Sequence, residues 1–181
     1  MLHELSFRTK VILVMVIVLL LFGLCSIFSP MFVLATFYFD SGNIVLSPVS
    51  ENYTFMMLAF SALLMGLGLL TWRKTKGTIA GFGLTVVLFC AFYYASTIGY
   101  FAIHQDYVLT VSVFGQQELM WEEMDMIDYT FENGYAGTYT FIKGVEEIVI
   151  METGQFSHGV SSAIRNIAQM HGILIERNEI K

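Results

Sequence analysis

The chain has 181 residues, of which 56% are hydrophobic and only 13% are charged, and this composition excludes an ordinary soluble domain. Its net charge of −6 is divided unevenly: residues 1–103 carry five basic and three acidic side chains (+2), whereas residues 104–181 carry four basic and twelve acidic ones (−8). We therefore expect an apolar membrane domain, residues 1–103, followed by an acidic, polar domain, residues 104–181. An acidic domain is poorly suited to nucleic acid or to anionic lipid headgroups, so no nucleic-acid partner is expected.

Three uncharged apolar runs predict transmembrane helices at about residues 11–38, 53–72 and 78–102. Each run reaches the roughly 20 residues that a helix needs to cross a bilayer. Pro30 lies late in the first run, where we expect a kink. The first run is longer than the apolar part of a cleaved signal peptide, so an uncleaved anchor is the favoured interpretation and a signal peptide is the alternative. The segment 40–52 is rich in turn-forming residues and is predicted to be a loop.

Basic side chains near the ends of these runs predict the orientation of the helices in the membrane. They precede the first run and fill the short segment between the second and the third, at Arg8, Lys10, Arg73, Lys74 and Lys76. Because lysine and arginine near membrane segments resist translocation, we expect the N-terminus and this short segment to be cytoplasmic. The loop 40–52 and the C-terminal domain then lie outside the cytoplasm. The pattern suits a multi-pass protein of the cell membrane, such as a bacterial inner membrane.

Small residues recur at helical spacing along the second and third runs, at Ala62, Gly66, Gly83, Ala91, Ala95 and Gly99. Small residues let helix backbones approach each other closely in lipid. They either pack the three helices of one chain together or form a face for a homo-oligomer. The three runs contain no Asp, Glu, Lys, Arg or His. Since ion-coupled transporters usually place such groups in the membrane, a transporter that acts alone is disfavoured.

From residue 104 onward, apolar and polar residues alternate, which predicts β-strands at 106–114, 117–121, 126–131, 138–143 and 147–152. Turns are expected at Gly115-Gln116 and at Asn133-Gly134. An amphipathic helix follows at about 156–170, with Gly172 as its C-terminal cap, and residues 173–175 can form a last short strand. The predicted fold class is therefore three transmembrane helices followed by a small antiparallel β domain that one amphipathic helix closes.

This order of elements resembles the bacterial pleckstrin-homology-like domains of small multi-span membrane proteins. The resemblance covers residues 104–178 and is carried by Tyr107-Val108-Leu109-Thr110, by Trp121-Glu122-Glu123-Met124 and by His171-Gly172-Ile173. It implies a strongly bent sheet or partial barrel plugged by the helix, and a role in interaction or scaffolding. Phosphoinositide-binding members of the wider superfamily use a basic loop between their first two strands, whereas Phe114-Gly115-Gln116-Gln117 is uncharged. Such bacterial domains usually face the cytoplasm, which conflicts with the orientation that the basic residues predict.

Few side chains of the chain are arranged for chemistry. The domain's histidines, His104, His158 and His171, form no recognisable ligand set even with Asp106, and Cys25 and Cys90 lie in apolar runs, so we expect no metal, cofactor or disulfide. No catalytic motif is present, so an enzyme is not expected. The densest acidic group is either a solvated link between strands or a binding site for a cationic protein partner, and it consists of Glu122, Glu123, Asp125 and Asp128.

Together, these features predict a non-enzymatic integral membrane protein. Its small β domain would bind a protein partner at the membrane surface and so scaffold or regulate a larger membrane complex. The alternative is a subunit of a transporter or export complex, held together through the small residues of the third run. An enzyme with a metal at His104 is the third and weakest hypothesis.

Overall fold

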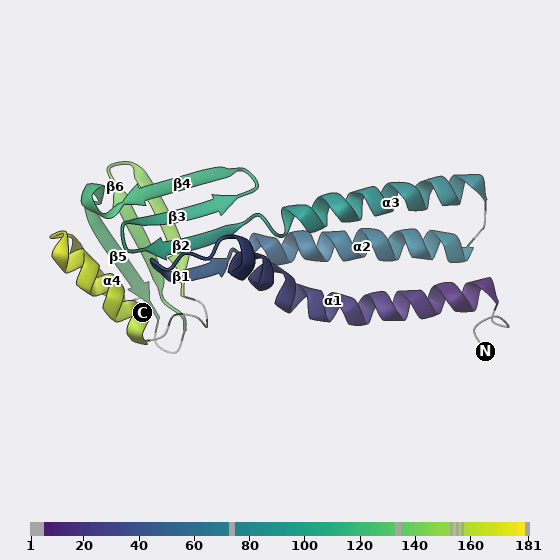
Figure 1. Ribbon diagram of the computed structural model, residues 1–181, viewed down its shortest axis with the longest axis horizontal. Helices are drawn as coiled ribbons and strands as arrows, with labels where there is room; N and C mark the ends of the chain where they lie inside the picture. The colour runs from purple at the N-terminus through teal and green to yellow at the C-terminus, as the bar shows by residue number, and fades with distance from the viewer. Residues whose placement is uncertain are drawn as a thin grey trace. The chain divides into compact units, whose positions relative to one another are not determined.

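The computed structural model describes residues 6–72, 75–132, 135–152, 154, 156 and 158–179, apart from the side chains of Ile27 and His158. The chain divides into two compact units. The helix unit is made of Met1–Thr36 and Pro48–Gly99, and the β unit is made of Phe37–Ser47 and Tyr100–Lys181. Figure 1 shows the elements of both.

The helix unit contains three helices, α1 (Phe7–Phe37), α2 (Glu51–Trp72) and α3 (Lys76–Ala95). Each contains a segment long and apolar enough to cross a membrane, as a multi-pass membrane protein requires. Pro30 lies inside α1, and Figure 1 shows this helix bending toward its C-terminal end. Helix α3 begins at a capping box, in which Thr75 and Thr78 each bind the other's backbone N–H.

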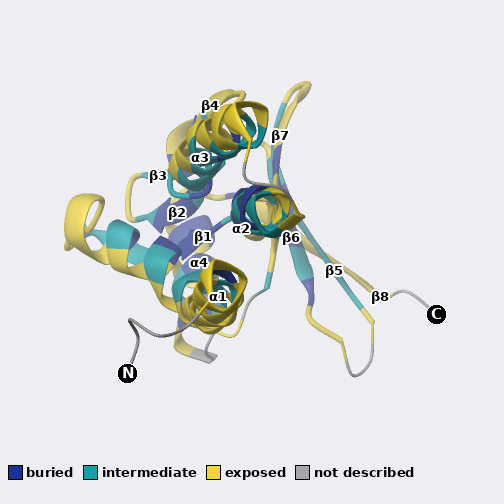
Figure 2. Cartoon of the chain, turned by 90° about the vertical axis from the view of Figure 1, so that its right-hand side faces the viewer, coloured by how far each residue is buried: buried dark blue, intermediate teal, exposed yellow. Residues whose placement is uncertain are grey.

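The helices pack against one another through small residues and aromatic rings. Gly66 of α2 lies against the side chains of Phe82 and Thr85, so this close approach of α2 and α3 depends on the missing Cβ. The Phe60 ring of α2 contacts Phe22 of α1 at 4.9 Å and Phe89 of α3 at 5.5 Å between centroids. The three helices therefore form one bundle through α2. Figure 2 shows that α1 and α3 nevertheless expose most of their surface.

The β unit contains two four-stranded sheets. The strands of the first sheet lie in the order β1-β2-β3-β4, with β1 at Asn43–Pro48, β2 at Tyr100–His104, β3 at Tyr107–Ser112 and β4 at Gly115–Met120. The second has the order β7-β6-β5-β8, with β5 at Met126–Phe131, β6 at Thr138–Lys143, β7 at Glu146–Met151 and β8 at Leu174–Glu179. A short 3₁₀ helix, η2 (Trp121–Glu123), joins β4 to β5, and α4 (His158–Met170) precedes β8.

The core of the β unit is built around Trp121. Its side chain is 1% exposed, meets Phe141 edge-on at 5.7 Å, and donates a hydrogen bond from Nε1 to the His104 carbonyl at 2.9 Å. Both sheets contribute fully buried strand residues, such as Ile103 and Val108 of the first and Ile127 and Phe141 of the second. Helix α4 adds its apolar face, Val160, Ile164, Ile167 and Ala168. The helix thus closes the β unit as its amphipathic pattern predicts.

The structure departs from the expected strands in several places. Residues 43–48, expected within a loop, form β1, and α3 ends at Ala95, so that residues 100–104 form β2 where a membrane helix was expected to finish. A buried strand and a membrane helix are equally apolar, so an unbroken apolar run does not distinguish them. Strand β8 pairs with β5 in parallel, so the second sheet is mixed instead of antiparallel. The expected turn at Asn133-Gly134 lies outside the described residues.

The first hairpin also turns two residues earlier than expected. Ser112 pairs with Gly115, which leaves Val113 and Phe114 as the two loop residues. The sequence pattern misplaces this turn because the apolar alternation continues through both residues. By contrast, the expected C-terminal cap of α4 is confirmed. Gly172 has φ 71°, and the N–H groups of Gly172 and Ile173 donate to the carbonyls of Gln169 and Ala168 at 3.2 and 2.8 Å.

Candidate functional site

The main candidate site is a pocket of about 540 Å³ in the β unit, between α4 and the sheet strands β5, β6 and β8. We name it the arginine pocket, because Arg165 and Arg177 line it together with Tyr129, Tyr139, Ser161 and Gln169. Its apolar lining comes from Ile164 of α4, from Ile173, which precedes β8, and from Leu174 and Ile175, which begin that strand. The volume is within the range of small-ligand sites.

The turn after α4 builds the apolar side of the arginine pocket. Gly172 adopts a left-handed conformation and reverses the chain, so that Ile173 packs back onto the core at 8% exposure. Leu174 follows and is 60% exposed, although it is a large apolar side chain. The pocket therefore pairs a buried apolar wall with an apolar residue that is available for contact.

The two arginines give the pocket a charge opposite to that of its surroundings. Residues 104–181 carry a charge of −8, yet two of their four basic residues line this one pocket. The Arg177 guanidinium lies over the rings of Tyr129 and Phe131, at 5.4 and 5.7 Å from the ring centroids, which fixes it in place. Among the described residues, neither arginine forms an ion pair with a carboxylate. Both can therefore bind an anion from outside the chain.

The tyrosines add neutral hydrogen-bond donors. Burial raises the pKa of Tyr139 above its usual value, and a hydrogen bond with Ser161 opposes this only in part. Burial also raises the pKa of Tyr129, and the nearby Glu152 carboxylate reinforces that shift. Both hydroxyls thus stay protonated at neutral pH. Guanidinium and phenol groups beside an apolar wall suit a ligand that has both a carboxylate-like anion and an apolar part.

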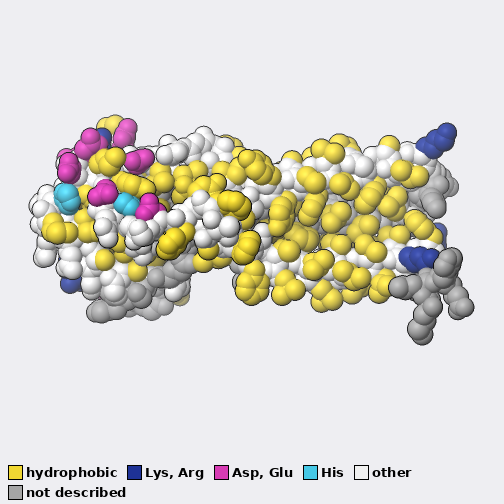
Figure 3. Space-filling view, in the orientation of Figure 1, with side chains coloured by type: hydrophobic (Ala, Val, Ile, Leu, Met, Phe, Trp, Pro, Cys, Tyr) yellow, Lys and Arg dark blue, Asp and Glu magenta, His cyan; other side chains and the backbone are white. Residues whose placement is uncertain are grey.

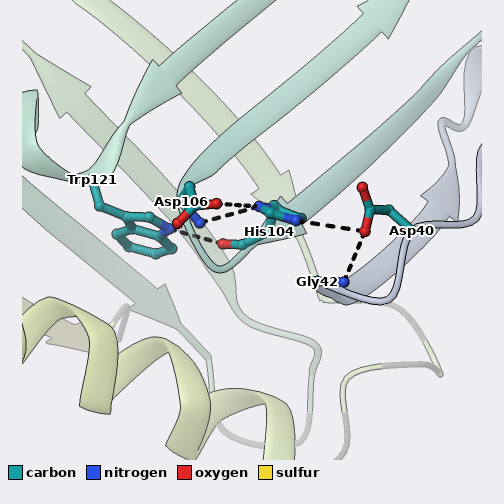
Figure 4. Close-up of polar contacts among 5 residues, drawn as sticks. All are labelled: Asp40, Gly42, His104, Asp106 and Trp121. Carbon is teal, nitrogen blue, oxygen red and sulfur yellow. Dashed lines mark hydrogen bonds and ion pairs between the residues drawn. The ribbon is translucent and has the colours of Figure 1, made fainter.

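A second polar cluster surrounds His104, and Figure 4 shows it. His104 Nδ1 accepts a hydrogen bond from the Asp106 backbone N–H at 3.2 Å, and Nε2 lies 3.9 Å from Asp40 Oδ1. The ring also stacks on Tyr107 and lies against Gly42, where a Cβ would clash with it. The Asp106 carboxylate also lies 3.4 Å from Nδ1, so the His104 ring connects the turn before β1 to the turn after β2. No group of three or more metal-binding side chains occurs in the described part of the chain.

The predicted acidic group serves the fold at three of its four positions. Glu123 Oε2 accepts a hydrogen bond from Lys143 Nζ at 2.6 Å, which raises the lysine's pKa. Asp125 Oδ2 accepts from the Gly144 backbone N–H at 2.6 Å, and Asp128 Oδ1 accepts from Asn178 at 2.9 Å. Glu122 is exposed on η2. These carboxylates connect η2 and β5 to the β6–β7 turn and to β8, and a role in partner binding stays a prediction.

The residues predicted to set the membrane orientation lie partly within the described chain. Arg8 and Lys10 are in the first turns of α1, and Lys76 begins α3. Figure 3 shows Lys and Arg side chains at the end of the helix unit where these two helices begin. Arg73 and Lys74 lie outside the described residues. The described basic residues of the helix unit thus lie where α1 and α3 begin, and the orientation in the membrane stays a prediction.

The predicted packing residues of the helix unit divide into two groups. Gly66 and Gly99 are buried within the chain, Gly99 against Val49 and against Asn52, whose side-chain amide donates to the Gly99 carbonyl at 2.6 Å. Ala62 and Ala95 are half-buried. Gly83 has no atom within 4 Å of a Cβ built on it, and Ala91 is exposed. Part of the α3 stripe therefore faces away from the rest of the described chain.

Sequence reasoning did not find the arginine pocket. It predicted only an amphipathic helix at about 156–170, the cap Gly172 and a possible short strand at 173–175 in this part of the chain. One signal was available, since both arginines flank the predicted cap Gly172 in a strongly acidic domain. The positions of Arg165 and Arg177 around Gly172 do not, however, predict that the chain after Gly172 pairs with β5.

Comparisons with known proteins identify no family. No protein-family model matches the chain, and a search of curated proteins returns no significant match. The function is therefore argued from the chain's own geometry.

Proposed function

We propose that this chain is a non-enzymatic integral membrane protein whose β unit binds a protein partner at the surface of the cell membrane. Three helices that are long and apolar enough to cross a bilayer support the membrane part of this proposal. The bound partner would be part of a larger membrane complex that the chain scaffolds or regulates. The resemblance to bacterial pleckstrin-homology-like domains belongs to the same proposal, since it also implies an interaction role.

The observation that carries the proposal is the arginine pocket. Arg165 and Arg177 lie in an acidic unit without a carboxylate partner among the described residues, next to exposed Leu174. Strand β8, which contributes to the pocket, is at the edge of its sheet and pairs only with β5 among the described strands. An extended partner segment can add to such an edge through its backbone, while its acidic and apolar side chains enter the pocket.

Photo-crosslinking in native membranes tests this proposal. A benzophenone amino acid replaces Leu174 in the pocket or, as a matched control, Val149 on β7, the opposite edge strand. The two residues are similarly exposed, at 60% and 58%. We expect a protein adduct at position 174 that is absent at 149 and is lost when Arg165→Glu and Arg177→Glu are added. Equal adducts at both positions, or an adduct that persists without the arginines, would overturn the proposal.

The proposed orientation has the N-terminus in the cytoplasm and the β unit outside it. The positions of Arg8, Lys10 and Lys76 at one end of the helix unit support it. A tag after Lys181, exposed to protease in intact cells, tests it directly. Cleavage is expected before permeabilisation, and protection until permeabilisation would place the partner in the cytoplasm instead.

A subunit of a transporter or export complex is the second candidate. The exposed positions Gly83 and Ala91 on α3 favour it, because small residues on an open helix face allow another membrane helix to approach. Gly83→Leu should then reduce the mass of the detergent-solubilised assembly, whereas Gly68→Leu on α2, a site that is likewise uncrowded, should not. An unchanged mass in both variants would remove this candidate.

A further inference from the structure

The turn between β3 and β4 exposes two apolar side chains. Phe114 is 85% exposed and Val113 is 41% exposed, whereas Phe101 and Phe141 of the same unit are 6% and 0% exposed. The turn is held in shape by Ser112, whose Oγ accepts from the Phe114 N–H at 3.2 Å. Two adjacent apolar side chains are therefore presented together at the tip of this hairpin.

The register of the sheet shows which end of the β unit carries this tip. Tyr100, the first residue of β2, pairs with Val111, so Val113 and Phe114 extend beyond the residue at which the chain enters the sheet from α3. With a rise of about 3.3 Å per residue, the tip projects on the order of 7 Å past Tyr100. Only four residues separate Tyr100 from Ala95, the end of α3.

The residue that follows α1 lies at the same end of the sheet. Tyr38, which directly follows α1, packs its ring on that of Tyr100 at 4.7 Å between centroids. Tyr38 and Tyr100, the residues of the β unit that follow the links from α1 and α3, thus both lie at the end of the sheet where the β3–β4 tip projects. Tyrosine side chains are favoured at the boundary between lipid and water. The tip therefore lies at the end of the β unit that is tethered to the two apolar helices.

The charges of the hairpin are distributed so that the tip is neutral. No charged residue occurs from Tyr107 to Gln117; Glu118, opposite Leu109, is the only charge within the hairpin, and Asp106 and Glu122 lie beyond its opposite end, where Tyr107 pairs with Met120. Figure 3 shows Asp and Glu side chains gathered toward that other end of the β unit. Anionic lipid headgroups repel an acidic unit. An uncharged tip can nevertheless enter the headgroup region, because it neither buries a charge there nor brings a negative charge close to the headgroups.

We propose that Val113 and Phe114 insert into the boundary between the lipid headgroups and the acyl chains, and so hold the β unit against the bilayer. This inference rests on the proposed function, because it requires the three apolar helices to span that bilayer. An apolar side chain that enters this boundary gains burial that no part of the described chain provides. Val145, at the turn between β6 and β7, is fully exposed but is flanked by Lys143, Glu146 and Glu147, so this turn is the control for an exposed turn that carries charges.

Depth-dependent fluorescence quenching tests the inference on the full chain in phosphatidylcholine vesicles. Cys25 and Cys90 are replaced by alanine, and an NBD dye is attached through Gln116→Cys, which leaves Val113 and Phe114 intact. Val145→Cys reports the control turn, and Leu84→Cys reports the middle of α3. Spin labels on the lipid quench the dye either near the headgroups (5-doxyl) or deep in the acyl region (12-doxyl).

We expect the dye at position 116 to be quenched by the shallow spin label and the dye at 145 not to be quenched. Phe114→Ser should abolish most of the quenching at 116, and Phe114→Leu should retain it. Because Phe114 is exposed, both variants should melt at the temperature of the parent, which separates loss of lipid contact from loss of folding.

Three results would overturn the inference, and they differ in whether the proposed function is also contradicted. If the dye at 84 is quenched by the deep spin label while positions 116 and 145 behave alike, only the tip insertion fails. If the dye at 84 is not quenched, the membrane span fails, and the proposed function fails with it. A dye at 116 that is shielded from water but not quenched by lipid would show that a second copy or another protein covers the tip.

Discussion

The helix unit and the β unit place the same kinds of side chain in opposite ways. Phenylalanine, leucine and isoleucine cover the outside of α1 and α3, whose apolar segments are only 6% and 11% buried within the chain. In the β unit a core of large apolar side chains points inward, and Trp121, Phe141, Ile103 and Ile127 are at most 1% exposed. Most of the apolar surface of α1 and α3 is thus not buried within the chain, as is typical of helices that are surrounded by lipid.

This difference indicates which interactions stabilise each unit. In water, folding the β unit is driven by removing apolar area from solvent. Between helices in lipid, that driving force is absent, and close packing at small residues and interhelical hydrogen bonds take its place. The contact of Gly66 with Phe82 and Thr85 and the hydrogen bond between Ser29 and Tyr93, at 2.7 Å, are of this second kind. Each unit should therefore respond to a different class of substitution.

The largest expected effect is the loss of the β unit's central side chain. Trp121→Ala leaves a cavity beside Phe141 and should destabilise the β unit by about 3–5 kcal/mol. Limited proteolysis of detergent-solubilised protein should then degrade the β unit, while the helices stay protected. Trp72→Ala, at a residue that is 78% exposed, is the control and should leave the protease pattern unchanged. Simultaneous degradation of both units in Trp121→Ala would show that they do not fold independently.

Within the helix unit, the sharpest test compares two glycines of α2. A side chain at Gly66 would meet Phe82 and Thr85, whereas a Cβ at Gly68 has no atom within 4 Å. Gly66→Val should destabilise the bundle by about 1–3 kcal/mol, and Gly68→Val should be close to neutral. Unfolding in mixed SDS micelles, followed by circular dichroism, measures both. Equal destabilisation would mean that helix propensity, and not the α2–α3 contact, determines the result.

A smaller effect distinguishes carboxylates that serve the fold from those that face solvent. Asp125→Ala removes the acceptor of the Gly144 N–H and should lower the stability of the β unit by about 1 kcal/mol. Glu122→Ala, on the adjacent 3₁₀ helix, should change it by less than about 0.5 kcal/mol. Thermal melting of the β unit measures the two variants side by side. A greater loss in Glu122→Ala would assign this group a structural role that the geometry does not show.

Sequence reasoning succeeded where a pattern has only one structural solution. The bounds expected for β5 and β6 agree with those in the structure, and Gly172 caps α4 as predicted, because alternation and a glycine after an amphipathic run are local signals. It failed at β2, since the run from residue 78 to 103 carries no charge, and the small polar residues Ser96 and Thr97, where the helix ends, are also tolerated inside a membrane helix. Strand β1 was missed because Gly42 and Pro48 enclose only a short apolar stretch.

The arginine pocket and the His104 cluster were beyond sequence reasoning for a different reason. Arg177 reaches the pocket because β8 pairs in parallel with β5, and Asp40 reaches His104 from a segment more than sixty residues earlier in the chain. Both arrangements depend on long-range pairing, which no local pattern specifies. Local patterns can therefore predict the elements of this fold more securely than its sites.

The smallest expected effect concerns pH and belongs to the β unit alone. Burial raises the pKa of Tyr100, Tyr107, Tyr129 and Tyr139 above the usual value of 10.0. A group whose pKa is raised by folding contributes stability below its unfolded pKa, and this stability is lost as the pH rises through the folded pKa. The melting temperature of the β unit should thus fall above about pH 10.

Tyr139→Phe removes one of these ionisable groups while keeping its ring beside Phe141 and Phe156. Its melting temperature should fall less steeply with alkaline pH than that of the parent, and absorbance at 295 nm should show one fewer late-titrating tyrosine. The exposed Tyr135→Phe is the control, because its side chain is 73% exposed and should leave the alkaline slope unchanged. If both variants reduce the alkaline fall of the melting temperature equally, repulsion between carboxylates and phenolates, and not burial, causes the loss of stability. The contrast between a buried β core and an exposed helix surface would then not extend to the ionisation of tyrosines.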